Sequence, residues 1–246
     1  MRIAMRLAVA VVVLVSAHAA WAQTAEDVIE KSLAALGGRA AHAKIKTRSM
    51  AGTITLVTPV GDIPGTIEIT NALPNKTRTL IKADLTSVGA GPLVIDQRFD
   101  GQSGYVLDSL QGNREITGNQ LDNLRNTGFP HAFLTYKELG IAAKLQGKET
   151  VGDREAYVLV FEPTAGSTIR QFIDAQSFLP TRFVMKVNVP QMGDLEQTTD
   201  LADYREVDGV KLPHKLVASS SLQSYTVEIS KVEHNAAVDE KQFVKP

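Results

Sequence analysis

The chain has 246 residues and no cysteine, and its 26 lysines and arginines nearly balance 27 aspartates and glutamates. Hydrophobic residues make up 43% and charged residues 22%, values that exclude a disordered, collagen-like or coiled-coil chain. The absence of cysteine excludes a disulfide scaffold, a cysteine-based metal site and a cysteine nucleophile. The nearly neutral charge argues against nucleic acid as a partner, because binding it requires a basic surface.

The first 22 residues have the three parts of a secretory signal peptide. Arg2 and Arg6 form a basic start, residues 7–17 form an apolar run, and Ala20-Trp21-Ala22 is a small-x-small cleavage site. The alternative is an uncleaved N-terminal anchor, which the length disfavours because a membrane-spanning helix needs about 20 apolar residues. The sequence therefore predicts export to the periplasm and a mature chain, residues 23–246, that forms one domain without stable membrane insertion.

The mature chain begins with a predicted amphipathic helix over Thr24–Leu36. Its apolar residues recur at the 3–4 spacing of one helix face. Thr24 and Asp27 resemble a capping box, with Asp in place of Glu or Gln. Gly37-Gly38 is a stop signal, and a short helical turn over residues 39–44 is expected next.

From Thr47 onward the apolar period changes to two, which is typical of antiparallel strands joined in hairpins. Asp100-Gly101 and Asp208-Gly209 are strong turn dipeptides between such strands. The predicted strands are 53–57, 66–70, 76–83, 93–99, 104–108, 156–162, 168–174, 180–189, 198–207, 211–218 and 224–233. These roughly eleven strands imply an antiparallel sheet curved into a barrel-like form.

The middle of the chain breaks this pattern. Residues 118–126 and 131–139 have leucine and phenylalanine at helical spacing, and Gly128 and Pro130 separate them. We expect two short helices that interrupt the strand series without dividing the chain into two domains. We expect these two helices to form a lid over the sheet. The side chains that would hold the lid are Leu121, Leu124, Phe133, Leu134 and Leu139.

Several predicted strands are apolar on both faces, notably residues 157–161 and 172–173. The second apolar face of such a strand must be covered by helices or by a ligand. One interpretation is that the predicted helices simply plug the sheet. The other is a hydrophobic ligand cavity between sheet and helices, and the two are compatible if the plug is loose.

No catalytic motif is present, neither a metalloprotease nor a nucleophile-elbow nor a phosphate-loop pattern. His42, His131, His214 and His234 are scattered singly and are expected to be surface histidines. The acidic run of residues 194–208 lacks the spacing of an EF-hand loop. We therefore predict a binding protein or carrier without metal or cofactor, and not an enzyme.

Five segments, in their order and spacing, resemble those of one bacterial family. They are residues 65–75, 98–105, 147–159 (leading through 172–174 to 179–182), 203–213 and 238–246. They include the strand ending in Leu73-Pro74-Asn75 and the closing Phe243. The family is the LolA/LolB-like outer membrane lipoprotein-sorting superfamily. The resemblance implies a signal peptide, an N-terminal helix and an incomplete β-barrel of about eleven strands closed by a helical lid.

Two features depart from the family pattern. The family's lid-latching arginine directly precedes the proline where this chain has Leu73, and the family's tryptophans in these strands are absent. The latch therefore cannot be carried over to this chain. We expect apolar closure of the lid that responds weakly to salt and pH.

The sequence thus predicts a mainly β (α+β) fold, a half-open antiparallel barrel with an N-terminal helix and a short helical lid. As a periplasmic carrier or chaperone it would bind acyl chains of a lipoprotein or another lipid, with membrane transport components as possible partners. The alternatives are a sensor or interaction module with a filled core and, third, a hydrolase with a dispersed site. The expected inward-facing residues are Ile67, Ile69, Ile95, Leu107, Leu159, Phe172, Phe183 and Met185, although a one-residue slip would reverse every face.

Overall fold

The computed structural model describes residues 23–189 and 193–246, so the predicted signal peptide lies outside the described residues. The helices are α1 (Ala25–Ala35), α2 (Gly38–His42), α3 (Gly118–Asn126) and α4 (Ala132–Thr135), with 3-10 turns η1 (Thr86–Val88) and η2 (Glu240–Phe243). The strands are β1 (Thr47–Thr58), β2 (Gly61–Ala72), β3 (Lys76–Asp84), β4 (Pro92–Phe99), β5 (Gly104–Asp108), β6 (Arg114–Ile116), β7 (Ala142–Val151), β8 (Arg154–Glu162), β9 (Ile169–Asp174), β10 (Pro180–Val189), β11 (Gly193–Val207), β12 (Val210–Ser219) and β13 (Ser224–His234).

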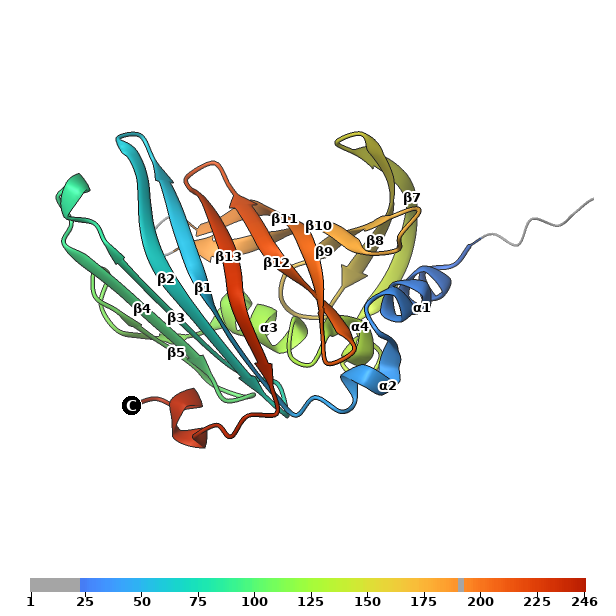
Figure 1. Ribbon diagram of the computed structural model, residues 1–246, viewed down its shortest axis with the longest axis horizontal. Coiled ribbons are helices and arrows are strands. Elements are labelled where there is room, and N and C mark those ends of the chain that lie inside the picture. Colours follow the sequence, from blue (N-terminus) through green and yellow to red (C-terminus); the bar gives the residue numbers. More distant parts are fainter. Residues whose placement is uncertain (1–22, 190–192) are drawn as a thin grey trace, which may run out of the picture.

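The described strands form one antiparallel sheet of thirteen strands that bends around α3 and α4 (Figure 1). Strands that follow one another in sequence pair, except β6 and β7, and β1 also pairs with β13. β6 and β7 are therefore the two edges of the sheet. The chain between these edges is the lid segment, residues 118–139. The sheet is therefore open, as predicted, and the lid segment connects its two edges.

Two strands were not predicted, β6 and β7. β6 has only three residues, too few for a period-two pattern. β7 is largely exposed, and its pairing with β8 shifts register between Leu145 and Gly147. Such a bulge interrupts the alternation that would reveal a strand.

Helix α1 packs on the β7–β9 end of the sheet. The predicted capping box is present, with the Asp27 backbone N–H donating to Thr24 Oγ1 and the Thr24 N–H donating to the Asp27 carboxylate. Val28, Ile29 and Leu33 of α1 are buried in one cluster with side chains of β8 and β9. No described helix is both long and apolar enough to span a membrane.

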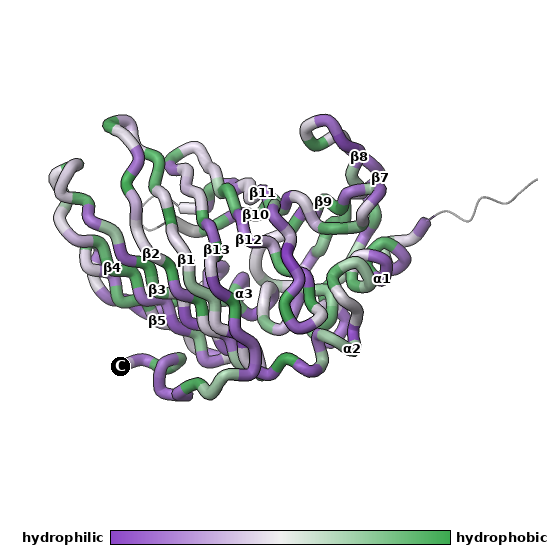
Figure 2. Tube along the Cα trace, viewed as in Figure 1, coloured by the Kyte–Doolittle hydropathy of each residue, from purple (hydrophilic) through white to green (hydrophobic). Residues whose placement is uncertain are grey.

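The two faces of the sheet differ, as the alternating colours along β1 to β5 in Figure 2 indicate. The concave face is the one that turns toward the lid segment. On the opposite, convex face, Val158 and Phe172 form a separate apolar cluster, and the Arg170 guanidinium lies 5.2 Å from the Phe172 ring centre. The apolar side chains on the convex face are therefore covered by neighbours and by the stem of an arginine.

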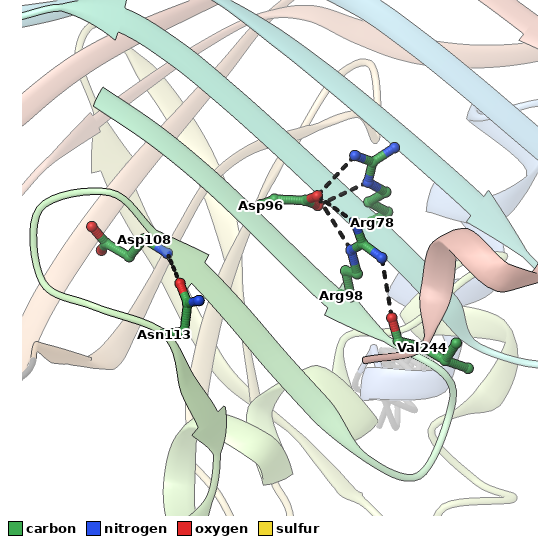
Figure 3. A network of polar contacts seen from close by, with 6 residues as sticks. All are labelled: Arg78, Asp96, Arg98, Asp108, Asn113 and Val244. Carbon is green, nitrogen blue, oxygen red and sulfur yellow. Dashed lines mark hydrogen bonds and ion pairs between the residues drawn. The ribbon is translucent and has the colours of Figure 1, made fainter. Parts of the chain in front are cut away.

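A network of ion pairs fixes the convex face of β3 and β4 (Figure 3). Asp96 is only 5% exposed and accepts hydrogen bonds of 2.8 Å from both Arg78 and Arg98. Arg98 also donates to the Val244 carbonyl and so holds the C-terminal segment. Burial opposes ionisation of Asp96, but the two arginines outweigh it, so the pKa of this carboxyl is lowered.

Asp96→Asn should reduce the free energy of unfolding by about 2–4 kcal/mol, because it leaves two adjacent guanidinium groups without their counter-charge. Urea unfolding at neutral pH measures the loss. A lowered pKa in the folded state means that the carboxylate stabilises the fold above its unfolded pKa of about 3.9 and loses this effect as the pH falls further. The difference between wild type and variant should therefore shrink below about pH 4.

Asp62→Asn is the matched control, since Asp62 is exposed on the neighbouring strand β2. It should change the free energy of unfolding by less than about 0.5 kcal/mol. Equal effects of the two substitutions would show that the network does not stabilise the fold.

Candidate ligand-binding cavity

A cavity of about 410 Å³ lies between the lid segment and the concave face of the sheet. This volume is in the lower part of the range of about 300–1,000 Å³ that small-molecule sites occupy. One wall is apolar and comes from β8 to β12, the lid segment and nearby chain. Its side chains include Leu36, Phe133, Tyr136, Ile141, Phe161, Ile169, Phe183, Met185, Leu201 and Leu212.

The other wall is polar and comes from β1 to β4. Arg48 pairs with Asn71 and Asn71 with Thr77 across neighbouring strands, while Thr79 pairs with Gln97. The Asn71 amide donates to Thr77 Oγ1 at 2.9 Å. These five side chains line the same cavity, and none was expected from the sequence. The cavity is therefore amphiphilic, with a polar and an apolar side.

Of the predicted inward-facing residues, Phe183 and Met185 line the cavity. Four others lie on the concave face but outside the cavity lining: Ile67, Ile69, Ile95 and Leu159. Leu159 is fully buried in the cluster with α1, so a helix covers this part of the face. Ile67 is buried and Ile69 partly buried in a second cluster with β1 and β13. Helix α1 therefore covers one part of the concave face, and a cavity lies over another part.

Leu107 and Phe172 were assigned to the wrong face. Leu107 pairs with Asp96, which lies on the convex face, and its neighbour Val106 pairs with Gln97 of the cavity wall. Phe172 belongs to the convex apolar cluster. Both strands have apolar residues at adjacent positions, so the pattern did not distinguish one face from the other.

The predicted lid residues also divide. Leu124 and Phe133 line the cavity, and Leu134 packs against the α1 cluster. Leu121 is partly buried outside the lining. Leu139 is 43% exposed, because α4 ends at Thr135 and the chain continues in turns, so the expectation that it docks is wrong. The second lid helix is thus much shorter than the predicted 131–139.

Hydrogen bonds to asparagines hold the lid segment on both sides, which corrects the expectation of purely apolar closure. On one side, Asn75 Nδ2 donates to the Arg125 carbonyl at 3.0 Å, and the Phe129 N–H donates to Asn75 Oδ1 at 3.2 Å. On the other side, Asn123 Oδ1 accepts from the Ser167 N–H at 2.7 Å, and Asn126 Nδ2 donates to the Ala165 carbonyl at 2.7 Å. The Asn75 side chain therefore holds one side of the lid segment in the closed position.

Gly128 leaves the room that this latch needs. A Cβ atom at this position would lie 1.6 Å from Asn75 Oδ1, far inside van der Waals contact. Asn75 itself has a φ of 52°, in the left-handed region that asparagine and glycine tolerate best. The closed lid therefore requires both the asparagine at position 75 and the glycine at position 128.

The lid also contains a buried titratable group, His131, which was expected at the surface. Its Nδ1 accepts the N–H of Phe133 at 3.2 Å, and its ring lines the cavity. Burial, and then the proximity of His42 and Arg48, lower the pKa of His131 to about 3. The pKa of His42 is also lowered, first by burial and then by Arg48. His131 is therefore neutral at physiological pH.

Gly128→Ala should open the lid by displacing the Asn75 side chain. Loss of its two hydrogen bonds, each contributing about 0.5–1.5 kcal/mol, should speed amide exchange in residues 118–139 roughly tenfold or more. Hydrogen-exchange mass spectrometry measures this, with strands β8 to β10 as the internal reference.

Asn75→Gly is the matched variant, because glycine keeps the left-handed backbone and removes only the latch. It should speed amide exchange in the lid segment to a similar extent. The double variant Asn75→Gly/Gly128→Ala should then exchange only slightly faster than Asn75→Gly alone. If Gly128→Ala has its full effect in the Asn75→Gly background, the latch is not the cause.

His131 should make stability depend on pH. A folded pKa of about 3, against about 6.5 in the unfolded chain, means that the fold is most stable above pH 6.5 and loses stability as the pH falls toward 3. Between pH 7.5 and 5 the loss should be about 1–2 kcal/mol greater in wild type than in His131→Asn, which keeps a side-chain acceptor for the helix cap. Urea unfolding at the two pH values checks this, and an identical loss in both proteins would contradict it.

The described residues contain no cluster of three or more histidines, aspartates or glutamates placed to hold a metal ion. Nor do the residues that line the cavity include an aspartate or glutamate within the described ranges. What the cavity offers a ligand is apolar surface, neutral hydrogen-bonding groups and two cationic side chains, Arg48 and Lys211.

No family model and no curated protein matches the chain. Solved structures match over most of its length. A LolA superfamily protein from Nitrosomonas europaea has a TM-score of 0.57 and 13% identity, covering 90% of this chain and 98% of that one. A DUF1329 family protein from Desulfovibrio piger has a TM-score of 0.55 and 12% identity, covering 89% and 95%.

An outer membrane lipoprotein-sorting protein domain from Vibrio parahaemolyticus has a TM-score of 0.54 and 13% identity, and the match covers 89% of this chain and 97% of that one. At such identities the likeness concerns the fold. The resemblance expected from the sequence is confirmed at this level: the chain has the mainly antiparallel, open β-barrel with helical elements that is found in LolA superfamily and lipoprotein-sorting proteins.

Proposed function

We propose that this protein binds an acyl chain of a lipid or lipoprotein in the cavity under its lid and carries it through the periplasm. Residues 23–246 would form the carrier as one domain after removal of the signal peptide. The observation that supports this is a cavity of about 410 Å³ with an apolar wall, in a fold shared with lipoprotein-sorting proteins.

The energetics suit a carrier. Each methylene that moves from water to an apolar wall contributes about 0.8 kcal/mol, so a long acyl chain gains enough to enter without any covalent or metal bond. The lid segment is held by a few asparagine hydrogen bonds and by the buried side chains of Phe129, Phe133 and Tyr136. Its helices are short and depend on docking, so an opening lid would give the chain entry and exit.

The alternative function is an interaction or sensor module whose interior is filled by its own side chains. The cluster between α1 and the β8–β9 region is such a filled part. The cavity beside this cluster favours the carrier, because a filled-core module would need no unfilled apolar wall. A hydrolase would need an activated nucleophile beside the cavity, and its lining within the described residues offers no carboxylate to complete a triad.

An environment-sensitive fluorescent fatty acid should bind to the chain lacking residues 1–22 at micromolar concentration. Phe183→Asp should weaken binding by at least about tenfold, because it places a charge in the apolar wall. Lys186→Asp, on the same strand but exposed on the convex face, is the matched control and should leave binding unchanged.

Circular dichroism should show the same β-rich spectrum for both variants. Absence of probe binding by the wild type at micromolar concentration would contradict the carrier and favour the filled-core module. Binding that Phe183→Asp does not weaken would place the probe outside the cavity.

A further inference from the structure

We propose that Arg48 binds the oxyanion head group of a single-chain amphiphile inside the cavity. This inference rests on the proposed function and specifies the ligand class: one apolar chain that ends in a carboxylate or a phosphate monoester. The chain would lie on the apolar wall, and the head group would lie on the polar wall beside Arg48.

Arg48 differs from every other arginine of the described residues. Each of the others lies within 4.0 Å of an aspartate or glutamate, whereas Arg48 forms no ion pair within the described chain. Its Nε is shielded from solvent and has no hydrogen-bond partner. Its one side-chain hydrogen bond, from Nη2 to Asn71 Oδ1, is long at 3.4 Å.

The surroundings do not neutralise this charge. The guanidinium lies 5.2 Å from the ring centre of Phe129, and the neighbouring His42 and His131 carry no negative charge in any protonation state. Burial lowers the pKa of Arg48 to about 10, which still leaves it cationic at neutral pH. Lys211, the other cationic residue of the lining, lies directly opposite Glu206 in the β11–β12 pair.

An unpaired, shielded cation costs free energy, and proteins keep such groups mainly at functional sites. A guanidinium offers parallel N–H donors that match the two oxygens of a carboxylate or phosphate. The Asn71 amide, the hydroxyls of Thr77 and Thr79 and the Gln97 amide lie on the same wall and supply further neutral donors. The missing partner of Arg48 is therefore an anion with oxygen ligands.

The apolar wall selects the rest of the ligand. Phe183, Met185 and Ile169 continue the cavity away from the polar strands β1 to β4. A volume of about 410 Å³ lies in the lower part of the range of small-molecule sites, which favours a ligand with a single chain. A free anion such as phosphate would satisfy Arg48 but would leave the apolar wall empty.

The test compares four probes on the protein without residues 1–22, by displacement of the fluorescent fatty acid: hexadecanoate, hexadecyl phosphate, hexadecanol and inorganic phosphate. We expect the two amphiphilic anions to bind at least tenfold more tightly than the alcohol, and inorganic phosphate to displace nothing at millimolar concentration. The ratio of hexadecanoate to hexadecyl phosphate then identifies the head group.

Arg48→Gln should reduce the affinity for the anions to that for hexadecanol while leaving the alcohol's affinity unchanged. Arg182→Gln is the matched control, because Arg182 pairs with Asp200 on the convex face and should not alter the preference for anions. Arg48→Gln should also raise the melting temperature of the empty protein by a few degrees, since it removes a partly buried charge that has no counter-ion.

Equal binding of acid and alcohol by the wild type would overturn the role of Arg48 and leave the carrier function intact. Binding of no hydrophobic probe would overturn the carrier function itself. Displacement by inorganic phosphate alone would replace the amphiphile with a free-anion site. The comparison of head groups on the wild type decides the inference even if Arg48→Gln does not fold.

Discussion

The open edges of the sheet determine what the rest of the molecule can do. A sheet that closed β6 onto β7 would remove both edges. Here those two strands are joined instead through the lid segment, which crosses the concave face. The segment that links β6 to β7 therefore also covers the cavity. Its hydrogen bonds with Asn75 and Ser167 contribute to the free energy of opening.

Most of the fold was predictable because local signals determine it. The apolar period of two residues and the turn dipeptides predict the hairpins. The capping box and the glycine stop signal predict the start and the end of α1. What the sequence could not provide was the pairing of β1 with β13, which joins two distant meanders. β6 and β7 were missed for a related reason: edge strands have little burial and therefore little pattern.

The site was less predictable, because hydrophobicity does not mark a cavity. Leu159 is as apolar as Phe183, yet a helix covers one and the other lines open space. Only the three-dimensional position of α1 separates them. Arg48 left a readable signal, since it shares the strand face of Met50 and Ile54, where an apolar residue is expected.

The apolar wall of the cavity would bind the chain of the ligand, and the polar wall would bind its head group. Apolar contact is nondirectional and scales with area, so the wall of Phe183 and Met185 favours chains of suitable length without selecting a head group. Arg48 supplies that selection, because a neutral head group leaves the guanidinium unpaired. The asparagine latch closes the lid through neutral hydrogen bonds and so leaves this charge uncompensated.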